Sequence, residues 1–478
     1  MHAVTTSGMA ASEGLARATV VVEAASVAAA CTKWATSHGT GDRSTFCAVS
    51  GRAGVLVHRA GTWGILTLFP LFAVYAWYIN EHCDGSLLGF LGRLEAGGWA
   101  FLVEAYPSPS WAAVRYILGF GLLQGVLQVW LPGPVHRGPT TPRGNVPTYT
   151  ANGVPTLATT LLIFLATWRA GLFDPGAVYD CMGSIVSTSN IMSLILCTLL
   201  YLKGWLAPSS TDSGTTGSLL YDFYWGMELY PRIGAFDIKV WTNCRMGMMG
   251  WSVITLCYAV KQAQLYGAPA TSMLLSVALV QVYIFKFFLW ETGYWSSMDI
   301  AHDRAGFYLC WGCLVWIPAV YTSPAMYLVR RPVNLPLSLT LVLGFLGLAA
   351  IYINYDSDRQ RQEFRQSDGK ALVWGAPPQA IRAQYRTGDG RTKTSLLLVS
   401  GWWGLARHFH YLPELVAAAI WSMPAFHFAI MPFVYLAFLT ILLLDRAYRD
   451  DARCSAKYGK YWDQYCQRVP YRVVPYLF

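Results

Sequence analysis

L-L-L-V-S-G-W-W-G-L-A-R-H-F-H-Y, residues 396–411, opens the stretch that decides the fold, and an apolar region follows it as far as residue 444. The stretch closes with D-R-A-Y-R-D-D-A-R-C-S-A-K-Y-G-K-Y-W-D-Q-Y-C-Q-R-V-P-Y-R, residues 445–472. Arg407, His408, His410 and Tyr411 lie in apolar surroundings, where polar groups without partners are costly. The tail alternates Arg and Lys with Tyr and Trp, which suits an anionic, planar ligand. Alternatively, these basic and aromatic residues anchor the chain at the membrane–water interface.

The whole chain has the composition of a polytopic membrane protein. Of its 478 residues, 54% are hydrophobic and 13% are charged, whereas about a quarter of a soluble domain is charged. The net charge of +9 is attributed to loops that set the topology, because no dense basic patch indicates nucleic acid. Aromatic residues make up 15% of the chain, which fits interfacial belts and a pocket for a large, flat, apolar ligand. We therefore expect an all-α membrane protein that binds no nucleic acid.

Apolar runs close to the roughly 20 residues that a spanning helix needs predict nine or ten transmembrane helices. We expect them at residues 62–80, 111–132, 154–172, 185–206, 246–260 with extensions, 273–291, 306–328 and 335–354, followed by a hairpin within 412–444. This order suggests an N-terminal half, residues 61–245, and a catalytic half, residues 246–478, whose C-terminal helices form the pocket.

Residues 1–60 form a separate, Ala-, Ser-, Thr- and Gly-rich extension. The run at 18–30 is too short to span a bilayer, and Glu23 interrupts it, which argues against a signal peptide. We expect a cytosolic, disordered extension, with a targeting peptide as the alternative. The loop at 355–393 and the tail are rich in Arg and Lys, which places both in the cytosol.

A polar stretch, Y-D-F-Y-W-G-M-E-L-Y-P-R-I-G-A-F-D-I-K-V-W-T-N-C-R at residues 221–245, interrupts the apolar runs. Glu228, Arg232, Asp237 and Lys239 can pair with one another, and we interpret the stretch as a structural ion-pair turn rather than a catalytic site. The eleven Cys lack the spacing of a disulfide framework. C-W-G-C at 310–313 is interpreted as core thiols rather than as a redox pair or half of a zinc site.

Candidate catalytic groups lie in W-E-T-G-Y-W-S-S-M-D-I-A-H-D-R, residues 290–304. Glu291, Asp299 and His302 are ionisable groups between apolar spans, and such groups are functional candidates. Tyr283 precedes Glu291 by two helical turns and so shares a helix face with it. A Tyr polarised by a carboxylate or a His can donate a proton into an apolar cavity. The spacing matches no zinc motif, so no metal site is expected.

Arg361 and Arg365 are four residues apart and share a face if the preceding helix continues into the cytosol. Two Arg on one face suit a phosphate group, although a positive-inside flank gives the same pattern. No G-x-G-x-x-G follows a predicted strand, so no Rossmann domain is expected to hold a dinucleotide. Any such cofactor needs another binding site, which the C-terminal region can supply.

These stretches, in this order, resemble the sterol reductases that reduce ring double bonds with NADPH, and most closely the plant-type Δ7-sterol reductases, over about residues 63–478. The resemblance implies that Tyr283 is the acid beside the sterol. It implies cofactor contacts at Arg361, Arg365, Leu398, Trp403, His410, Tyr411, Asp450, Cys454, Ser455, Ala456, Lys457, Tyr458 and Tyr465. His410 matches the plant-type members, whereas animal members commonly have Asn. Trp290 also departs from the Asn that is usual in animal members, and Lys is frequent at the Arg361 position.

The implied reaction converts a Δ5,7-sterol, as in 7-dehydrocholesterol to cholesterol. Protonation at C8 leaves an allylic cation over C5 to C7, which a hydride from NADPH quenches at C7 in a dry cavity. The implied setting is the endoplasmic reticulum membrane, with sterol, lipid and other sterol-biosynthesis enzymes as partners. The alternatives are a Δ14-sterol reductase, a non-catalytic sterol-binding protein of the same fold, and a membrane methyltransferase, which the paired Arg residues fit less well. A transporter usually has internal repeats, and we see none.

Overall fold

The computed structural model describes residues 52–141, 143–386, 392–425 and 429–478. The expected disordered extension therefore falls mostly outside the described residues, and α3 already begins at Arg52. The first half contains α3 (Arg52–His82), α4 (Leu87–Ala105), α5 (Trp111–Trp130), α6 (Gly153–Arg169), α7 (Pro175–Asp180), α8 (Met182–Leu206) and α9 (Leu219–Trp225).

The second half begins in the polar stretch and is also mainly helical. Its elements up to the end of the long helix before the basic loop are α10 (Ile238–Val240), η1 (Trp241–Met248), α11 (Met249–Tyr266), α12 (Thr271–Leu289), α13 (Glu291–Tyr294), α14 (Met298–Ala301), α15 (Phe307–Trp311), η2 (Gly312–Tyr321), α16 (Ser323–Val329) and α17 (Leu337–Gln366). After the loop come α18 (Trp402–Leu405), α19 (Tyr411–Ser422), η3 (Met423–Ala425), η4 (Met431–Phe433), α20 (Val434–Tyr458) and α21 (Lys460–Arg468).

Seven helices among the described residues are long and apolar enough to cross a membrane. They lie at Ala60–His82, Trp111–Trp130, Met182–Leu206, Thr271–Leu289, Phe307–Val329, Leu337–Gln366 and Met431–Tyr458. The other expected spans also form helices, but α6 has 17 residues, α19 has 12, and α11 carries Lys261. The protein is thus a multi-pass helical membrane protein, and a count of nine or ten spans is not confirmed.

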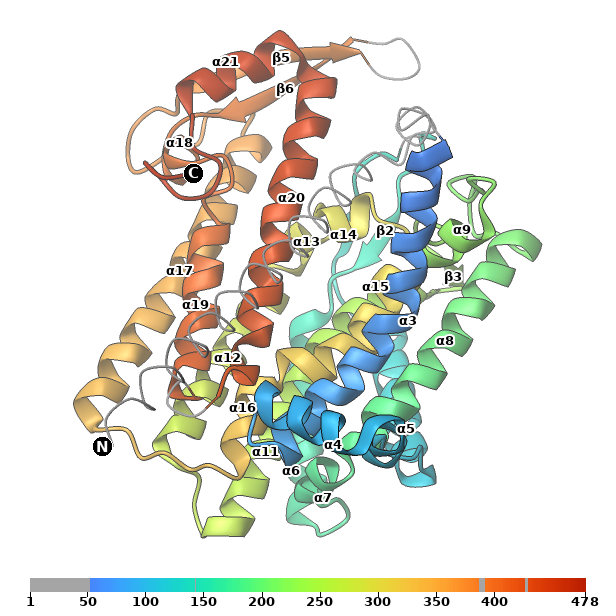
Figure 1. Ribbon diagram of the computed structural model, residues 1–478. Coiled ribbons are helices and arrows are strands. Elements are labelled where there is room, and N and C mark those ends of the chain that lie inside the picture. The colour runs from blue at the N-terminus through green and yellow to red at the C-terminus, as the bar shows by residue number, and fades with distance from the viewer. Residues whose placement is uncertain (1–51, 142, 387–391, 426–428) are drawn as a thin grey trace, which may run out of the picture.

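The described residues also contain three two-stranded antiparallel hairpins, which an all-α fold did not anticipate. They are β1 (Val135–Arg137) with β2 (Thr148–Thr150), β3 (Arg232–Ile233) with β4 (Phe236–Asp237), and β5 (Ala380–Arg386) with β6 (Thr392–Leu398). The longest, β5–β6, lies beside α21 at one end of the bundle (Figure 1). The opening residues of the deciding stretch, Leu396 to Leu398, therefore belong to a strand.

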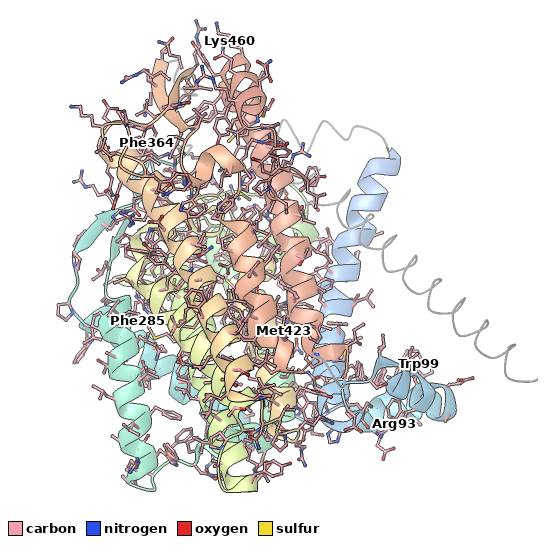
Figure 2. The ribbon with its side chains drawn as sticks, turned by 90° about the vertical axis from the view of Figure 1, so that its left-hand side faces the viewer. Arg93, Trp99, Phe285, Phe364, Met423 and Lys460 are labelled. Carbon is pink, nitrogen blue, oxygen red and sulfur yellow. The ribbon has the colours of Figure 1, made fainter. Side chains whose placement is uncertain are left out.

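The spanning helices run side by side, with α17, α19 and α20 on one side of the bundle and α3, α5 and α8 on the other (Figure 1). α17 packs against α12 and α19, and α3 packs against α8 and η2. Phe364 and Lys460 mark one end of the molecule in the side view, whereas Arg93 and Trp99 of α4 mark the other (Figure 2). The end that carries β5–β6 is the one that the basic loop and tail occupy.

Two π-helical segments, η1 and η2, pack against each other in the middle of the bundle. Pro318 lies inside η2, where it removes a backbone donor and crowds the preceding turn, so a regular α-helix cannot continue. Asn243 of η1 and Cys313 of η2 are joined by a 2.8 Å hydrogen bond, in which the thiol donates to Asn243 Oδ1. Both residues lie in the wall of the central cavity.

The polar stretch at 221–245 braces the loop that precedes α15. Arg232 pairs with Asp237 at 2.9 Å, as expected, but Glu228 pairs with Lys203 of α8 at 2.8 Å instead. The Lys239 ammonium donates to the carbonyl of Ile300 at 2.8 Å. Gly226 has φ of 103° and lies against residues 305 and 306, where a Cβ atom would approach the backbone nitrogen of residue 306 to 2.5 Å. The stretch is therefore a structural clamp, as its charge pattern indicated.

Candidate active site

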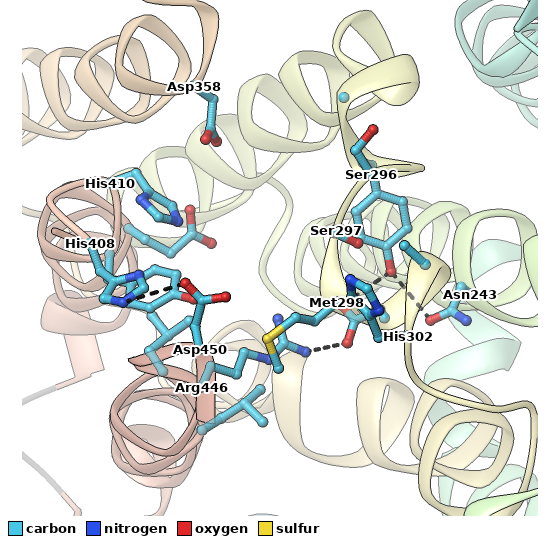
Figure 3. A pocket seen from close by; sticks show the side chains of 18 of the residues that line it. Asn243, Ser296, Ser297, Met298, His302, Asp358, His408, His410, Arg446 and Asp450 are labelled. Carbon is cyan, nitrogen blue, oxygen red and sulfur yellow. Dashed lines mark hydrogen bonds and ion pairs between the residues drawn. The ribbon is translucent and has the colours of Figure 1, made fainter. Parts of the chain in front are cut away.

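A large cavity of about 1630 Å³ lies between the C-terminal helices and the segment that contains η2 and the 290–304 loop. Its walls come from α12, α17, α19 and α20 on one side and from α14, α15 and η2 on the other (Figure 3). One end is lined by aromatic and aliphatic side chains, and the other by Arg, Lys, His and Asp. The cavity thus offers an apolar compartment that continues into a basic one.

Tyr283 of α12, the proton donor that the sequence suggested, lines the cavity in its apolar compartment. Its hydroxyl donates to Glu414 Oε1 of α19 at 2.5 Å. Its ring lies 5.7 Å from the ring of Trp251 and 5.4 Å from that of Trp421, centroid to centroid. The Lys286 ammonium lies 4.5 Å from the centroid of the Tyr283 ring. A tyrosine hydroxyl therefore stands in an aromatic enclosure, and its carboxylate partner is Glu414 rather than Glu291.

Glu291 is buried outside the cavity wall. Its carboxylate pairs with Arg245 at 2.7 Å and accepts a hydrogen bond from the backbone N–H of Gly153 at 2.8 Å. The helix-face argument that joined it to Tyr283 fails because α12 ends at Leu289 and Trp290 leaves the helical backbone with φ of −106° and ψ of 23°. In this structure Glu291 connects η1, α6 and α13.

Asp299 and His302 both line the cavity, and His302 lies on the wall opposite His408 and Asp450 (Figure 3). Asp299 accepts a 2.5 Å hydrogen bond from Arg446 of α20, and it also accepts from the Tyr294 hydroxyl at 3.4 Å. The ion pair links the 290–304 loop to the C-terminal helix across the cavity. Within the described residues no group of three or more His, Cys, Asp or Glu is arranged to hold a metal ion.

Arg361 and Arg365 lie on the cavity-facing side of α17, as their spacing predicted. The Arg361 guanidinium stands 4.1 Å from the centroid of the Trp403 ring and 3.2 Å from Asp358 Oδ1. A stacked Arg presents its donors in the plane of the guanidinium, which suits a phosphate oxygen. The two Arg side chains form the positive rim of the basic compartment.

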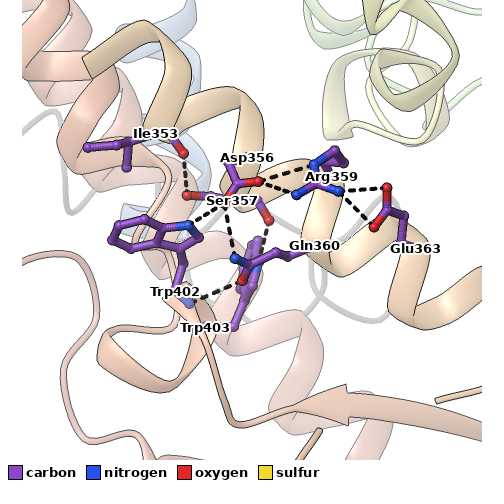
Figure 4. Close-up of polar contacts among 8 residues, drawn as sticks. All are labelled: Ile353, Asp356, Ser357, Arg359, Gln360, Glu363, Trp402 and Trp403. Carbon is purple, nitrogen blue, oxygen red and sulfur yellow. Dashed lines mark hydrogen bonds and ion pairs between the residues drawn. The ribbon is translucent and has the colours of Figure 1, made fainter. Parts of the chain in front are cut away.

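A turn at residues 401–411 places Trp403 and His410 against this rim. The Trp403 indole donates to the Ser357 carbonyl at 2.7 Å, and the Trp402 indole donates to Asp356 Oδ2 at 2.8 Å (Figure 4). Gly401 has φ of 65°, a conformation that favours glycine. The two indoles therefore fasten the turn to α17 and orient its aromatic face towards the cavity.

His408 and His410 lie on the same turn and form an aromatic stack with their neighbours. The His410 ring lies 5.0 Å from Trp403 and 4.3 Å from Tyr411, and His408 stacks on Tyr411 at 5.2 Å. Burial, reinforced by Arg361 and His408, holds the pKa of His410 well below its usual value. Burial likewise lowers the pKa of His408, which lies 3.9 Å from Asp450. Both rings are neutral at pH 7 and can act as donors or acceptors.

Comparison with known proteins agrees with this geometry. Residues 56–478 match the model of the Ergosterol biosynthesis ERG4/ERG24 family. The chain belongs to this family of sterol reductases. A 7-dehydrocholesterol reductase of Arabidopsis thaliana is 52% identical over 424 residues, which cover 88% of this chain and 98% of that protein. The Xenopus laevis 7-dehydrocholesterol reductase is 36% identical over 78% of this chain and 82% of its own. A Delta(14)-sterol reductase of Methylotuvimicrobium alcaliphilum is 34% identical over 87% and 95%.

Most positions that the sterol reductase resemblance assigned to the cofactor line the same compartment. They are Arg361, Arg365, Leu398, Trp403, His410, Tyr411, Asp450, Cys454, Lys457, Tyr458 and Tyr465. Ser455 and Ala456 do not line it, because they lie on the exposed side of α20. Residues from α17, β6, α18, α20 and α21 are thus brought together without a Rossmann domain.

Sequence reasoning missed Glu414, Lys286 and Arg446 in this sterol reductase. Glu414 comes directly after the H-Y-L-P run, in the first turn of α19. An acidic residue there is the usual mark of a helix start, so it did not indicate a site residue. Lys286 lies three residues after Tyr283, and its spacing on the same helix face was a usable signal. Nothing in the sequence indicated that Arg446 meets Asp299, because that contact joins residues 147 positions apart.

Proposed function

We propose that this chain reduces the C7–C8 double bond of Δ5,7-sterols with NADPH. The observation that carries the proposal is the single cavity that Tyr283 lines in its apolar compartment and Arg361 and Arg365 line in its basic one. Membership of the sterol reductase family and the 52% identity to the Arabidopsis thaliana 7-dehydrocholesterol reductase support the same reaction. We propose the endoplasmic reticulum membrane as its location, where other enzymes of sterol biosynthesis can act as partners.

The residues present fit a dinucleotide phosphate. Arg361 and Arg365 can receive phosphate charge, and Trp403, His410 and Tyr411 offer flat faces for ring stacking. His410 Nδ1 is buried and has no hydrogen-bond partner among the described residues, so it can meet a polar atom of a ligand. When bound, NADPH supplies the hydride.

The sterol would occupy the apolar compartment with its conjugated diene beside Tyr283. The Tyr283 hydroxyl is the proton donor to C8, and proton transfer from a positioned group contributes about 10²–10⁴-fold in rate. Trp251 and Trp421 contact its ring and Tyr435 packs on both of them, and aromatic faces stabilise positive charge at close range. Exclusion of water from this compartment protects the allylic cation from side reactions.

The test is a microsomal assay of the full chain with 7-dehydrocholesterol and NADPH, which follows loss of the diene absorbance. We expect turnover by the parent and a fall in kcat of about 100-fold or more in Tyr283→Phe. Arg361→Ala combined with Arg365→Ala should raise KM for NADPH, because the phosphate loses its charged partners. Arg382→Ala with Arg386→Ala is the matched control, since these two exposed Arg residues of β5 do not line the cavity.

A Δ14-sterol reductase is the second candidate, because a Delta(14)-sterol reductase matches 87% of this chain at 34% identity. Both activities need the same acid and cofactor compartments and differ in which ring double bond stands beside Tyr283. A folded parent that reduces a Δ14-sterol but not 7-dehydrocholesterol would establish this activity. A folded parent that reduces neither and does not bind NADPH would instead be a sterol-binding protein, and methyl transfer would require S-adenosylmethionine binding.

A further inference from the structure

Glu414 joins the candidate proton donor to a second acidic group. It stands in the first turn of α19 and lines the cavity. Its Oε1 and the Tyr283 hydroxyl oxygen are 2.5 Å apart, a distance at which a proton can pass directly between them. The helix N-terminus favours negative charge at this position. Glu414 can therefore give up a proton and remain as a carboxylate.

The Lys286 side chain supplies a positive charge near that carboxylate. Lys286 lies beside the Tyr283 ring and interacts electrostatically with Glu414. Its ammonium donates to Asn354 Oδ1 at 2.5 Å, and the Asn354 amide donates to the His410 carbonyl at 2.8 Å. Asn354 thus holds Lys286 in place between α12 and α17.

Two further ionisable groups face Glu414 from the neighbouring helices. They are Asp358 of α17 and Tyr435 of α20, each of which interacts with it electrostatically. Asp358 lines the cavity next to Arg361, at the edge of the basic compartment. Asp358 therefore stands between the surroundings of Glu414 and those of Arg361, both of which line the cavity.

Tyr283 alone is a poor source for the proton that the reaction needs. The unperturbed pKa of Tyr is about 10, whereas that of Glu is about 4.3. Proton loss from Tyr283 alone would leave a phenolate in an apolar compartment, where an isolated charge is costly. A carboxyl group behind the phenol removes this cost, because the negative charge then rests on Glu414 beside Lys286.

We propose that Glu414 is the proton reservoir behind Tyr283 and acts on the sterol through it. In the structure the Tyr283 hydroxyl donates to Glu414, so the relay begins once Glu414 has taken up a proton and donates to Tyr283 instead. The Glu414 O–H bond then breaks as its proton bonds to the Tyr283 oxygen, and the original Tyr283 O–H bond breaks as that proton bonds to C8. The electron pair of the C7–C8 π bond forms the new C8–H bond. The products are a neutral Tyr283, a Glu414 carboxylate and a sterol cation, which the hydride from the cofactor discharges. The inference rests on the proposed sterol reduction.

The test compares Glu414→Gln and Glu414→Asp with the parent in the microsomal diene assay. We expect kcat of Glu414→Gln to fall about 100-fold while KM for sterol and NADPH changes by less than about threefold, because Gln fills the same space. Glu414→Asp should recover part of the rate. Parent activity should decrease as pH rises because the reaction consumes a proton, and this limb of the pH profile should be absent from Glu414→Gln. Glu363→Gln, an exposed carboxyl group of α17 outside the cavity, is the control and should match the parent.

Glu414→Gln with a rate within about threefold of the parent would overturn the proposal. A uniform loss with an unchanged pH profile would also overturn it, since that is the effect of a purely structural residue. If Glu414→Gln does not bind NADPH and is therefore misfolded, the pH profile of Glu414→Asp decides instead. A decline in activity at the same pH as in the parent would count against the proposal. A parent that does not reduce the diene would contradict the sterol reductase function itself. An active parent with an equally active Glu414→Gln would contradict only the proton transfer from Glu414 through Tyr283.

Discussion

Arg245 and Glu291 form an ion pair that connects η1 to α13 in the interior of the protein. The Arg245 side chain is fully buried, and that of Glu291 is 2% exposed. Removal of one partner leaves the other charge buried and unpaired, which costs about 3–5 kcal/mol. We therefore expect Glu291→Gln to lower the thermal unfolding midpoint of the purified protein in detergent, with activity lost as a consequence of unfolding.

A paired substitution separates this structural role from a catalytic one. Arg245→Met together with Glu291→Gln leaves no lone charge, so both the midpoint and diene reduction should recover in part. Glu363→Gln breaks an exposed pair with Arg359 and should change stability by about 0–1 kcal/mol. A double variant that is folded but inactive would show that Glu291 takes part in the chemistry.

At the residue scale, local spacing predicted contacts within a helix and failed wherever a helix ended. Arg361 and Arg365 share a face of α17 because that helix runs without interruption to Gln366. Tyr283 and Glu291 do not share one, because the turn at Trp290 redirects the chain between them. The carboxylate that contacts the Tyr283 hydroxyl belongs to Glu414, which lies 131 residues later in the sequence. A single sequence carries no signal for such a contact.

At the scale of elements, the turn at 401–411 depends on neutral imidazoles. The folded pKa of His410 is lowered by burial, whereas an unfolded His has a pKa of about 6.5. As pH falls through about 6.5, His410 therefore binds a proton in the unfolded chain but not in the folded chain. The free energy of unfolding decreases as a result. His410→Asn cannot titrate, so its unfolding midpoint should fall less than that of the parent between pH 7.5 and pH 5.

The comparison needs a variant of the same turn that leaves the imidazole in place. Tyr411→Phe removes a hydroxyl group but no group that titrates between pH 5 and pH 7.5, so its midpoint should follow the pH dependence of the parent. Equal pH slopes for the parent and His410→Asn would contradict the assignment of a neutral, buried ring.

Apolar run length predicted the spanning helices well because the bilayer imposes a length on them. It missed α4, which is apolar but has a non-helical kink at Gly98 and projects sideways from the bundle (Figure 2). It also missed β5–β6, whose strands alternate buried and exposed residues over only part of their length. Both elements lie at the ends of the bundle, where tertiary contacts rather than membrane thickness determine the conformation.

At the scale of the whole molecule, the Arg and Lys residues of the C-terminal loop and tail gather at one end. α17 ends there, α3 begins there, and β5–β6 and α21 lie there as well (Figure 1). At the opposite end Arg330 pairs with Glu81, Arg331 with Asp84, and Lys261 with Asp180, whereas Arg93 meets the Tyr78 hydroxyl. The asymmetry supports a cytosolic cofactor compartment, since Lys and Arg are retained on that side of a membrane.

This orientation can be tested with inserted glycosylation acceptors, because Asn-x-Ser/Thr is modified only on the luminal side. A short loop with one acceptor, inserted after Gly267 in the exposed connection between α11 and α12, should be glycosylated. The same loop inserted after the exposed Lys370 should remain unmodified, because that position lies beside the basic compartment. The readout is a glycosidase-sensitive increase in mass, measured on variants that still reduce the sterol diene and are therefore folded. Modification after Lys370 but not after Gly267 would reverse the orientation and place the basic compartment in the lumen.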